Sequence, residues 1–218
     1  MKIKWYGHAA FLINSDKGLK IITDPYESGA YGDQLAYGKI KDQADFALIS
    51  HDHADHNDSK SLPGSPQIVK GTGSKTVKGI SFKGISTYHD PSKGSERGTN
   101  TIFTFSVDGI QVCHLGDLGH ILSEKELAEI GPVDILLIPV GGYFTIDSKE
   151  ATRVAEQIKP KVLIPMHFKT EKCGFPIAPV EDFLKGKSNV KRLKTSEATF
   201  DKVTLPQQME IVVLEHAL

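Results

Sequence analysis

The amino-acid sequence predicts an α/β protein, a four-layer αββα sandwich in which two β-sheets pack face to face with helices outside them. Short apolar runs closed by Gly, Pro, Asp or Asn fill the first half of the chain, as is typical of strands joined by turns. In the second half, strands alternate with helices. Two apolar runs there are continuous, which indicates strands that are buried on both faces.

The first half of the chain is expected to be β-structure. The dipeptide Asp108-Gly109 lies between two apolar runs, and this pair is a strong signal for a tight hairpin. The expected strands are Ile3–Tyr6, Ala9–Ile13, Leu19–Thr23, Phe46–Ser50, Gln67–Val69, Thr101–Val107 and Gln111–Leu115.

Three helices are expected in the second half. Two begin at capping-box patterns, Ser123 with Glu126 and Asp147 with Glu150. Gly131-Pro132 ends the first helix and Lys159-Pro160 ends the second, because proline does not continue a helix. The third helix follows Pro179. The expected strands between and after these helices are Val133–Val140, Val162–Met166 and Glu210–Glu215.

Length and composition limit the class of protein. The chain has 218 residues, which predicts one domain over residues 1–218. A formal charge of −1 gives no reason to expect nucleic acid as a partner, so the expected partner is a small-molecule substrate. No apolar run is long enough to span a membrane, and no signal peptide is expected. With only two cysteines, the chain is expected to be cytoplasmic, and its sequence sets no oligomeric state.

A dense group of metal-binding residue types follows the expected strand Phe46–Ser50, in the segment His51-Asp52-His53-Ala54-Asp55-His56. If the strand continues, His51 and His53 point to the same side, and Asp55 and His56 can turn back to the same point. Such groups suit borderline cations such as Zn²⁺. Two ions are expected, because one tetrahedral ion would not use all four groups and keep an open position. The alternative, a solvated charged loop, explains the clustered histidines poorly.

This segment resembles the His-x-His-x-Asp-His signature of the metallo-β-lactamase superfamily. The resemblance implies that His51 and His53 bind a first ion and that Asp55 and His56 bind a second. It also implies three further ligands: His89 for the first ion, Asp117 as the bridging carboxylate and His167 for the second ion. Asp55 and Asp117 are thus expected to be catalytic as well as metal-binding. The matching segments are Thr87-Tyr88-His89-Asp90, His114-Leu115-Gly116-Asp117 and Ile164-Pro165-Met166-His167.

A narrower resemblance comes from the first strands. Trp5-Tyr6-Gly7-His8-Ala9 and Ile22-Thr23-Asp24-Pro25 resemble the branch that contains sugar-phosphate (ascorbate phosphate) lactonases and N-acylphosphatidylethanolamine phospholipase D-like proteins. Pro139–Thr145 and Pro165–Phe168 fit the same branch. The resemblance does not determine the substrate, because one fold hosts many functions.

The expected reaction is hydrolysis of an ester-type bond, a phosphodiester or a lactone. The expected cofactor is a pair of divalent ions, zinc foremost, with manganese or iron as alternatives. Two such ions lie about 3.5–4 Å apart and lower the pKa of bound water to about 7, so a metal-bound hydroxide is the expected nucleophile. Activity is expected to fall in mild acid, because protonated histidines do not bind metal.

Other residues are candidates for supporting roles. Asp24, Asp52 and Asp90 are candidates to accept the second ring N–H of a ligand histidine, Asp24 being the best placed. The alternative for each is an ordinary turn aspartate. His8 is a candidate to support the ligands or contact substrate. His114 competes with His89 for the first ion, and the resemblance favours His89, which leaves His114 a structural or supporting role.

Two loops are candidates for the substrate site. Residues 25–43 form a long segment without periodicity, either a lid over the metals or an ordinary surface excursion. Lys93 and Arg97 follow His89 and could meet an anionic substrate, although a charged loop is often merely solvated. Tyr143 and Phe144 are candidate pocket walls or core residues.

Two other function classes remain open at this stage. One is an iron-dependent oxidoreductase on the same fold. The other is a non-catalytic metal-binding protein.

Overall fold

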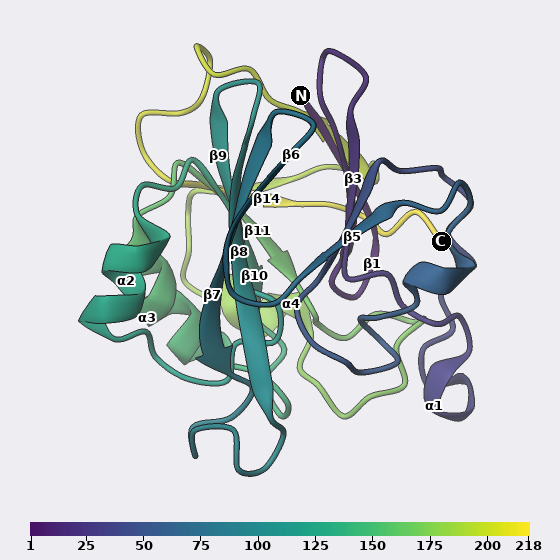
Figure 1. Ribbon diagram of the computed structural model, residues 1–218. Helices are drawn as coiled ribbons and strands as arrows, with labels where there is room; N and C mark the ends of the chain where they lie inside the picture. Colours follow the sequence, from purple (N-terminus) through teal and green to yellow (C-terminus); the bar gives the residue numbers. More distant parts are fainter.

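The computed structural model describes residues 1–218, and its strands form two sheets that pack face to face around a common core (Figure 1). The smaller sheet contains, in spatial order, β13 (Glu197–Thr199), β1 (Lys2–Gly7), β2 (Ala10–Asn14), β3 (Lys20–Thr23), β4 (Phe46–Ile49) and β5 (Gln67–Lys70). The larger contains β12 (Val190–Arg192), β14 (Glu210–Val213), β11 (Val162–Met166), β10 (Ile135–Pro139), β9 (Ile110–His114), β8 (Thr99–Val107), β7 (Ile80–Tyr88) and β6 (Gly73–Val77).

The outer layers differ on the two sides. Figure 1 shows α2 (Glu124–Ile130) and α3 (Ser148–Ile158) outside the larger sheet, and α3 packs against α4 (Val180–Leu184). On the other side, α1 (Ala30–Asp33) and η1 (Ser59–Ser61) are single turns, and irregular segments around them bury the outer face of the smaller sheet. The architecture agrees with the sandwich that the sequence predicts. No helix is long and apolar enough to cross a membrane.

Alternation along the smaller sheet explains why it is buried on both faces. On β2, Phe11 and Ile13 belong to the core between the sheets, whereas Ala10 and Leu12 belong to the cluster on the outer face. Strand side chains point to opposite faces in turn, so an all-apolar strand needs two partners. The segment from Tyr26 to Ile40 supplies the second partner with buried Tyr26, Leu35, Tyr37 and Ile40.

Local signals for turns and helix starts are confirmed. Both capping boxes are present, with Ser123 and Asp147 as the N-cap residues of α2 and α3. Asp108 and Gly109 have φ of 52° and 76°, and Val107 pairs with Ile110 across the hairpin. These positive φ values are those of the type I′ turn that fits the strand twist.

The sequence prediction missed four strands and placed several strand ends too far along the chain. β6, β7, β12 and β13 were not expected; β6 is largely exposed and carries only one large apolar side chain, Val77. β14 ends at Val213, although the strand was expected to continue to Glu215. β4 ends at Ile49, so His51 and His53 do not lie on a continued strand.

Asp134 is a charged residue that ties three strands together at the end of the sheet opposite to the histidines. Its carboxylate accepts the backbone N–H of Gln111 and contacts Lys161 and Lys202. Burial opposes ionisation of Asp134, but the N–H of Gln111 and the two ammonium groups outweigh it and lower its pKa. The stabilising contribution of a lowered pKa is present above the unfolded-state pKa, about 3.9, and is lost as the pH falls through the folded-state value.

We therefore expect Asp134→Asn to lower the free energy of unfolding by about 2 kcal/mol at neutral pH. The difference from wild type should shrink as the pH falls from about 4 towards the lowered pKa of the native carboxyl, where that group becomes protonated. Urea unfolding at pH 7 and pH 3.5, in buffer with a chelator, measures both quantities. Glu156→Gln is the control, because Glu156 is exposed on α3. An equal deficit at both pH values would contradict the ionic origin.

Candidate metal centre

The candidate site lies at the edge where strands of both sheets end. From the smaller sheet, His8 follows β1 and the segment 51–56 follows β4. From the larger sheet, His89 follows β7, Asp117 comes three residues after β9, and His167 follows β11. β9 and β11 both run parallel to β10, so their carboxyl ends meet at the same edge. Residues that are up to 159 positions apart, from His8 to His167, thereby become neighbours.

The side chains form two groups that could each hold a cation. One group is His51, His53 and His89, and the other is His8, Asp55, His56 and His167; within each group the donor atoms lie within 4.8 Å of one another. A third set, His51, His56 and Asp117, meets the same criterion and overlaps both. The structure thus brings together all seven residues that the sequence predicts as ligands, and it adds His8.

Asp117 lies between the two groups. Its Oδ2 atom is 3.1 Å from His89 Nε2, 3.2 Å from His56 Nε2 and 3.2 Å from His167 Nε2. The His51 Nε2 atom is 3.9 Å away. One carboxylate oxygen therefore faces histidines of both groups, which is the position that a bridging ligand requires.

Hydrogen bonds orient several of the histidine rings. His56 Nδ1 is 3.0 Å from Asp24 Oδ2, His89 Nδ1 is 3.1 Å from the Phe144 carbonyl oxygen, and His51 Nδ1 is 2.9 Å from Ser50 Oγ. In each case Nε2 is left directed at the cluster. Partners of this kind fix the tautomer and ring orientation of a metal-binding histidine.

Asp24 holds the turn after β4 as well as the His56 ring. It is 1% exposed, and its carboxylate accepts the backbone N–H of Ser50 at 2.8 Å and the hydroxyl of Ser50 at 2.7 Å. The other two candidates for such a role do not contact the histidines. Asp52 is exposed and bonds to Asn57, and Asp90 accepts four backbone N–H groups of the loop that follows it.

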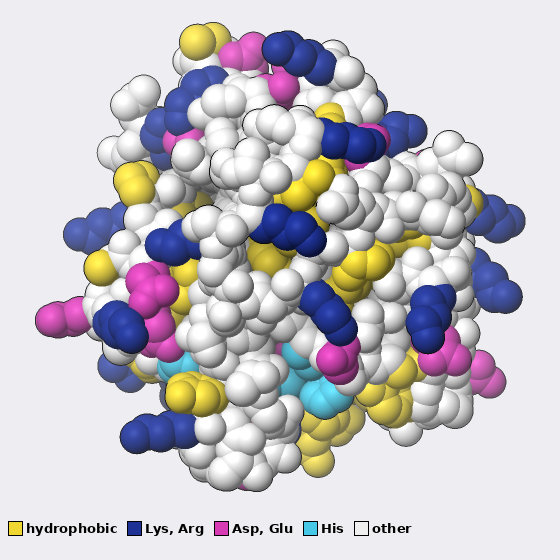
Figure 2. Space-filling model, in the orientation of Figure 1, with side chains coloured by type: hydrophobic (Ala, Val, Ile, Leu, Met, Phe, Trp, Pro, Cys, Tyr) yellow, Lys and Arg dark blue, Asp and Glu magenta, His cyan; other side chains and the backbone are white.

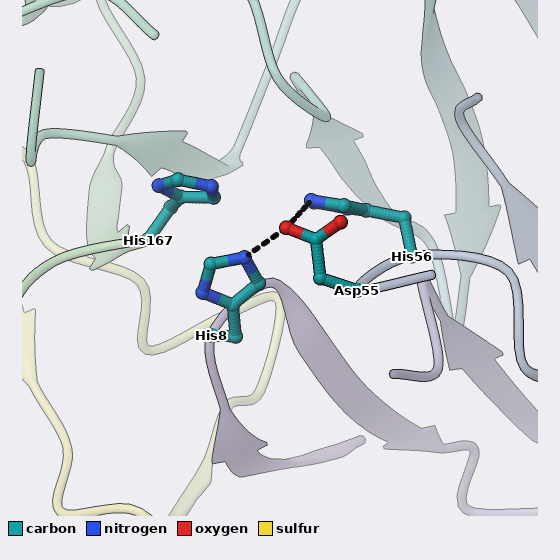
Figure 3. Close-up of side chains that lie close together, drawn as sticks. All are labelled: His8, Asp55, His56 and His167. Atoms are coloured by element: carbon teal, nitrogen blue, oxygen red, sulfur yellow. Dashed lines mark hydrogen bonds and ion pairs between the residues drawn. The ribbon is translucent and has the colours of Figure 1, made fainter. Parts of the chain in front are cut away.

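His114 and His8 have different surroundings. His114 Nε2 is 3.1 Å from the carbonyl oxygen of Ala9, and its Nδ1 accepts the N–H of Gly116, so both nitrogens are used inside the fold. His8 is fully buried, and its Nε2 lies 3.0 Å from Asp55 Oδ2 (Figure 3). The ring centroids of His8 and His167 are 3.9 Å apart.

Two functional contacts were not predicted from the sequence. Asn100 accepts the backbone N–H of Asp117 at 3.0 Å and donates to the Leu115 carbonyl oxygen, which fixes the turn that carries Asp117. Tyr31 donates its hydroxyl to Asp55 Oδ1 at 3.1 Å. Neither residue belongs to a periodic pattern or a recognisable motif, so no local signal identifies it.

The surroundings of His51 and Asp117 shift their pKa values towards the protonation states that bind metal. Burial lowers the pKa of His51 to about 3, with the charge of His56 as the next cause, so this imidazole is neutral. Burial opposes ionisation of Asp117, but the charges of His167, His56 and His89 outweigh it and hold its pKa well below the usual value. Metal ligands bind in these forms, neutral imidazole and charged carboxylate.

Buried polar atoms without partners test whether a cation fits. His8 Nδ1, His51 Nε2, His56 Nε2, His167 Nδ1 and Asp117 Oδ1 are buried and make no hydrogen bond. An unsatisfied buried group costs about 1–3 kcal/mol, so such a cluster needs an explanation. His51 and His56 Nε2 lie near Asp117 without hydrogen-bond alignment, as expected for donors that converge on a shared cation. The donor set fits divalent metal ions.

A cleft of about 530 Å³ opens onto the cluster. It is lined by His53, Asp55, His89 and Asp117 at the cluster, by Tyr31, Tyr143, Phe144, Phe175 and Pro176, and by Gln34, Glu96 and Arg97. Figure 2 shows that histidine side chains reach the surface on the face viewed there. Arg97 therefore lies at the cleft, whereas Lys93 is exposed and is not part of the lining.

Comparisons with known proteins agree with this geometry. Residues 2–167 match the model of the β-lactamase superfamily domain, so the fold and cluster are those of a metallo-β-lactamase-fold protein. A metallo-β-lactamase-superfamily structure from Thermotoga maritima superposes with a TM-score of 0.81 at 37% identity, over 98% of both chains. A diiron β-hydroxylase from Streptomyces venezuelae, at 14% identity and a TM-score of 0.55, shares the fold alone.

The relatives in sequence define the family more narrowly. A UPF0173 metal-dependent hydrolase from Carboxydothermus hydrogenoformans is 36% identical over 202 residues, 78% of this chain and 85% of the relative. One from Thermococcus kodakarensis is 30% identical over 202 residues, with the same coverage. The chain belongs to the UPF0173 metal-dependent hydrolase family of the metallo-β-lactamase superfamily.

Proposed function

We propose that the protein is a dinuclear zinc hydrolase that cleaves an ester-type bond, a phosphodiester or a lactone. The observation that carries the proposal is the pair of donor groups on either side of Asp117, at the base of a cleft. His51, His53 and His89 would hold one ion, and Asp55, His56 and His167 the other, with Asp117 as a ligand of both. When bound, such ions lower the pKa of water to about 7 and polarise the oxygen of the scissile bond.

The cleft lining favours water as the nucleophile. It contains no serine, threonine, cysteine or lysine, the residue types that most often form covalent intermediates. Both cysteines of the chain are buried and have free thiols, which also fits the cytoplasmic location that the sequence predicts. Burial raises the pKa of Tyr31, so its hydroxyl stays protonated and donates to Asp55.

The two catalytic carboxylates act through their charge. Burial opposes ionisation of Asp55, but the charge and hydrogen bond of His56 and the hydrogen bond of His8 outweigh it and lower its pKa. Carboxylates with such low pKa values are weak proton acceptors, so Asp55 and Asp117 serve as anionic ligands rather than as general bases. Tyr31 and His8 hold the two oxygens of Asp55 in place.

Metal content and hydrolysis together test the proposal. Elemental mass spectrometry should find about two zinc ions per chain, as in two-metal hydrolases. Bis(p-nitrophenyl) phosphate and a panel of lactones, including sugar-phosphate lactones, then identify the bond type. Asp55→Ala should lose metal and turnover, whereas Asp52→Ala is the matched control because Asp52 is exposed. Protein without tightly bound metal would contradict the proposal, and iron with no hydrolysis would favour an oxidoreductase.

Asp24 provides a separate prediction about the second ion. Asp24→Asn keeps the shape of the side chain but weakens its bond to His56 Nδ1 and its hold on Ser50. Loss of such a partner typically lowers metal affinity about 10–100-fold. Competition with a chromogenic chelator measures the affinity of each ion, with Asp52→Asn as the control. Equal affinities in Asp24→Asn and wild type would show that Asp24 only holds the turn.

A further inference from the structure

Two exposed aromatic side chains flank the cleft over the metal cluster. Only three large hydrophobic side chains of the whole structure are exposed: Tyr31 at 50%, Tyr143 at 65% and Val203 at 88%. Both tyrosines line the cleft, and Val203 does not. Exposed aromatic surface beside a polar site is a common sign of ligand binding.

The backbone at both tyrosines is in an unusual conformation. Tyr31 has φ of 56° and Tyr143 has φ of 64°, in the left-handed region that bulky residues rarely adopt. Glycine or asparagine takes this conformation with less strain. The rings are half exposed or more, so their burial contributes little to folding. Strained residues of this kind are typical of ligand-binding sites. Because the aromatic ring is not needed for folding at either position, we infer that its role is to contact a ligand.

Neighbouring rings make the tyrosines part of one aromatic wall. Tyr143 lies 4.7 Å from Phe144, Phe144 lies 5.6 Å from Phe175, and Phe175 lies 5.5 Å from Tyr31, measured between ring centroids. All three pairs meet edge to face. The wall therefore runs continuously from one exposed tyrosine to the other along the cleft that contains Asp55 and Asp117.

The positively charged side chain of Arg97 also lines the cleft. The Arg97 guanidinium lies 5.9 Å from the centre of the Phe144 ring, and its nearest carboxylate is Glu96 at 3.5 Å. The Glu96 side chain is 55% exposed, and exposed ion pairs contribute little free energy. Arg97 is therefore free to exchange Glu96 for an anion in the cleft, where two parallel N–H bonds favour carboxylate or phosphate groups.

We propose that the substrate is an anionic ester with a planar unsaturated ring. The ring lies against Tyr143 and the aromatic wall, the negative charge faces Arg97, and the scissile bond faces the metal donors. This inference rests on the proposed hydrolase function and specifies its substrate class. Aromatic rings in contact gain free energy beyond buried area, which an alkyl chain of similar size does not.

Three phosphonates separate ring, chain and charge as determinants of binding. Phenylphosphonate, hexylphosphonate and methylphosphonate carry the same anionic group, and isothermal titration of the zinc-loaded protein gives their affinities. We expect phenylphosphonate to bind most tightly. Tyr143→Asn should weaken phenylphosphonate about threefold to tenfold and leave methylphosphonate unchanged. Arg97→Met should weaken all three.

The Tyr143→Asn variant has a second readout that does not depend on ligand. Relief of the left-handed strain should raise the Tm by about 2–4 °C. Lys159→Asn is the matched control, because Lys159 has φ of 55° at the end of α3, is exposed and does not line the cleft. It should raise the Tm in the same way and leave all three affinities unchanged.

Other outcomes would overturn the inference. Tighter binding of hexylphosphonate would indicate an alkyl substrate, and equal loss of all three probes in Tyr143→Asn would indicate general damage to the site. Metal content measured on the same samples separates the two proposals. Absence of ring preference in protein that holds its zinc contradicts the substrate class alone, whereas protein without metal contradicts the hydrolase function as well.

Discussion

Asp117→Asn is expected to remove metal from both groups of ligands and to lower kcat/KM by at least about 100-fold. Mutation of a residue that only hydrogen-bonds to a metal ligand already lowers metal affinity or activity about 10–100-fold. Asp117 Oδ2 is the one carboxylate oxygen within 3.2 Å of His56, His89 and His167 Nε2. Asparagine has nearly the same shape and preserves the backbone bond from Asp117 to Asn100, so the change removes charge without disturbing the turn.

Elemental mass spectrometry and hydrolysis of bis(p-nitrophenyl) phosphate measure the effect. Asp52→Asn removes one negative charge near the site, but its side chain is 69% exposed, so it should keep metal and activity. Circular dichroism establishes that both variants are folded. Full metal content in Asp117→Asn would contradict the bridging position that the geometry gives this residue.

Gly119→Ala is expected to move the backbone at His89 and thereby to disturb the first group of ligands, His51, His53 and His89. A Cβ atom at Gly119 would lie 2.3 Å from the amide nitrogen of Asp90 and 2.3 Å from the carbonyl carbon of His89. Backbone atoms at this distance must move, which displaces the His89 ring. Such overpacking typically costs about 1–3 kcal/mol and sometimes more. We therefore expect lower stability and loss of the metal ion bound through His89.

Zinc titration and urea unfolding test this prediction. Gly38→Ala is the control, because a Cβ there would meet Leu218 at 3.6 Å, an ordinary contact distance. The atoms nearest to a Cβ at Gly119 belong to His89 and Asp90 and not to His56 or His167, so the second group should retain its ion. Loss of both ions, or of neither, would contradict the selective effect.

The sequence was sufficient for the parts of the fold that depend on local signals. The two capping boxes, the Asp108-Gly109 hairpin and the buried strand Val162–Met166 were all predicted because each is encoded within a few residues. β6 was missed because most of its residues are exposed, so apolar periodicity is nearly absent. Its pairing with β7 depends on backbone hydrogen bonds, which leave little trace in composition.

The residues of the candidate site were also predictable only where a local sequence signal exists. The segment 51–56 and the motifs around His89, Asp117 and His167 could be recognised because each is short and contiguous. Of the aromatic wall, Tyr143 and Phe144 were candidate pocket walls, whereas the contact of Tyr31 with Asp55 could not be recognised because it comes from a loop with no periodic pattern. His8 was assigned only a supporting role, and its place beside Asp55 depends on the strand order of the smaller sheet, because His8 follows β1 and Asp55 lies in the loop after β4.

The spacing of the ligands along the chain has a consequence for synthesis on the ribosome. His51, His53 and His89 all precede residue 90, whereas the second group is incomplete until His167 has been made. Its earliest member, His8, receives the backbone N–H of His167 at its own carbonyl oxygen. Synthesis adds about 5–20 residues per second. The nascent chain thus contains the donors of the first group several seconds before those of the second group are complete.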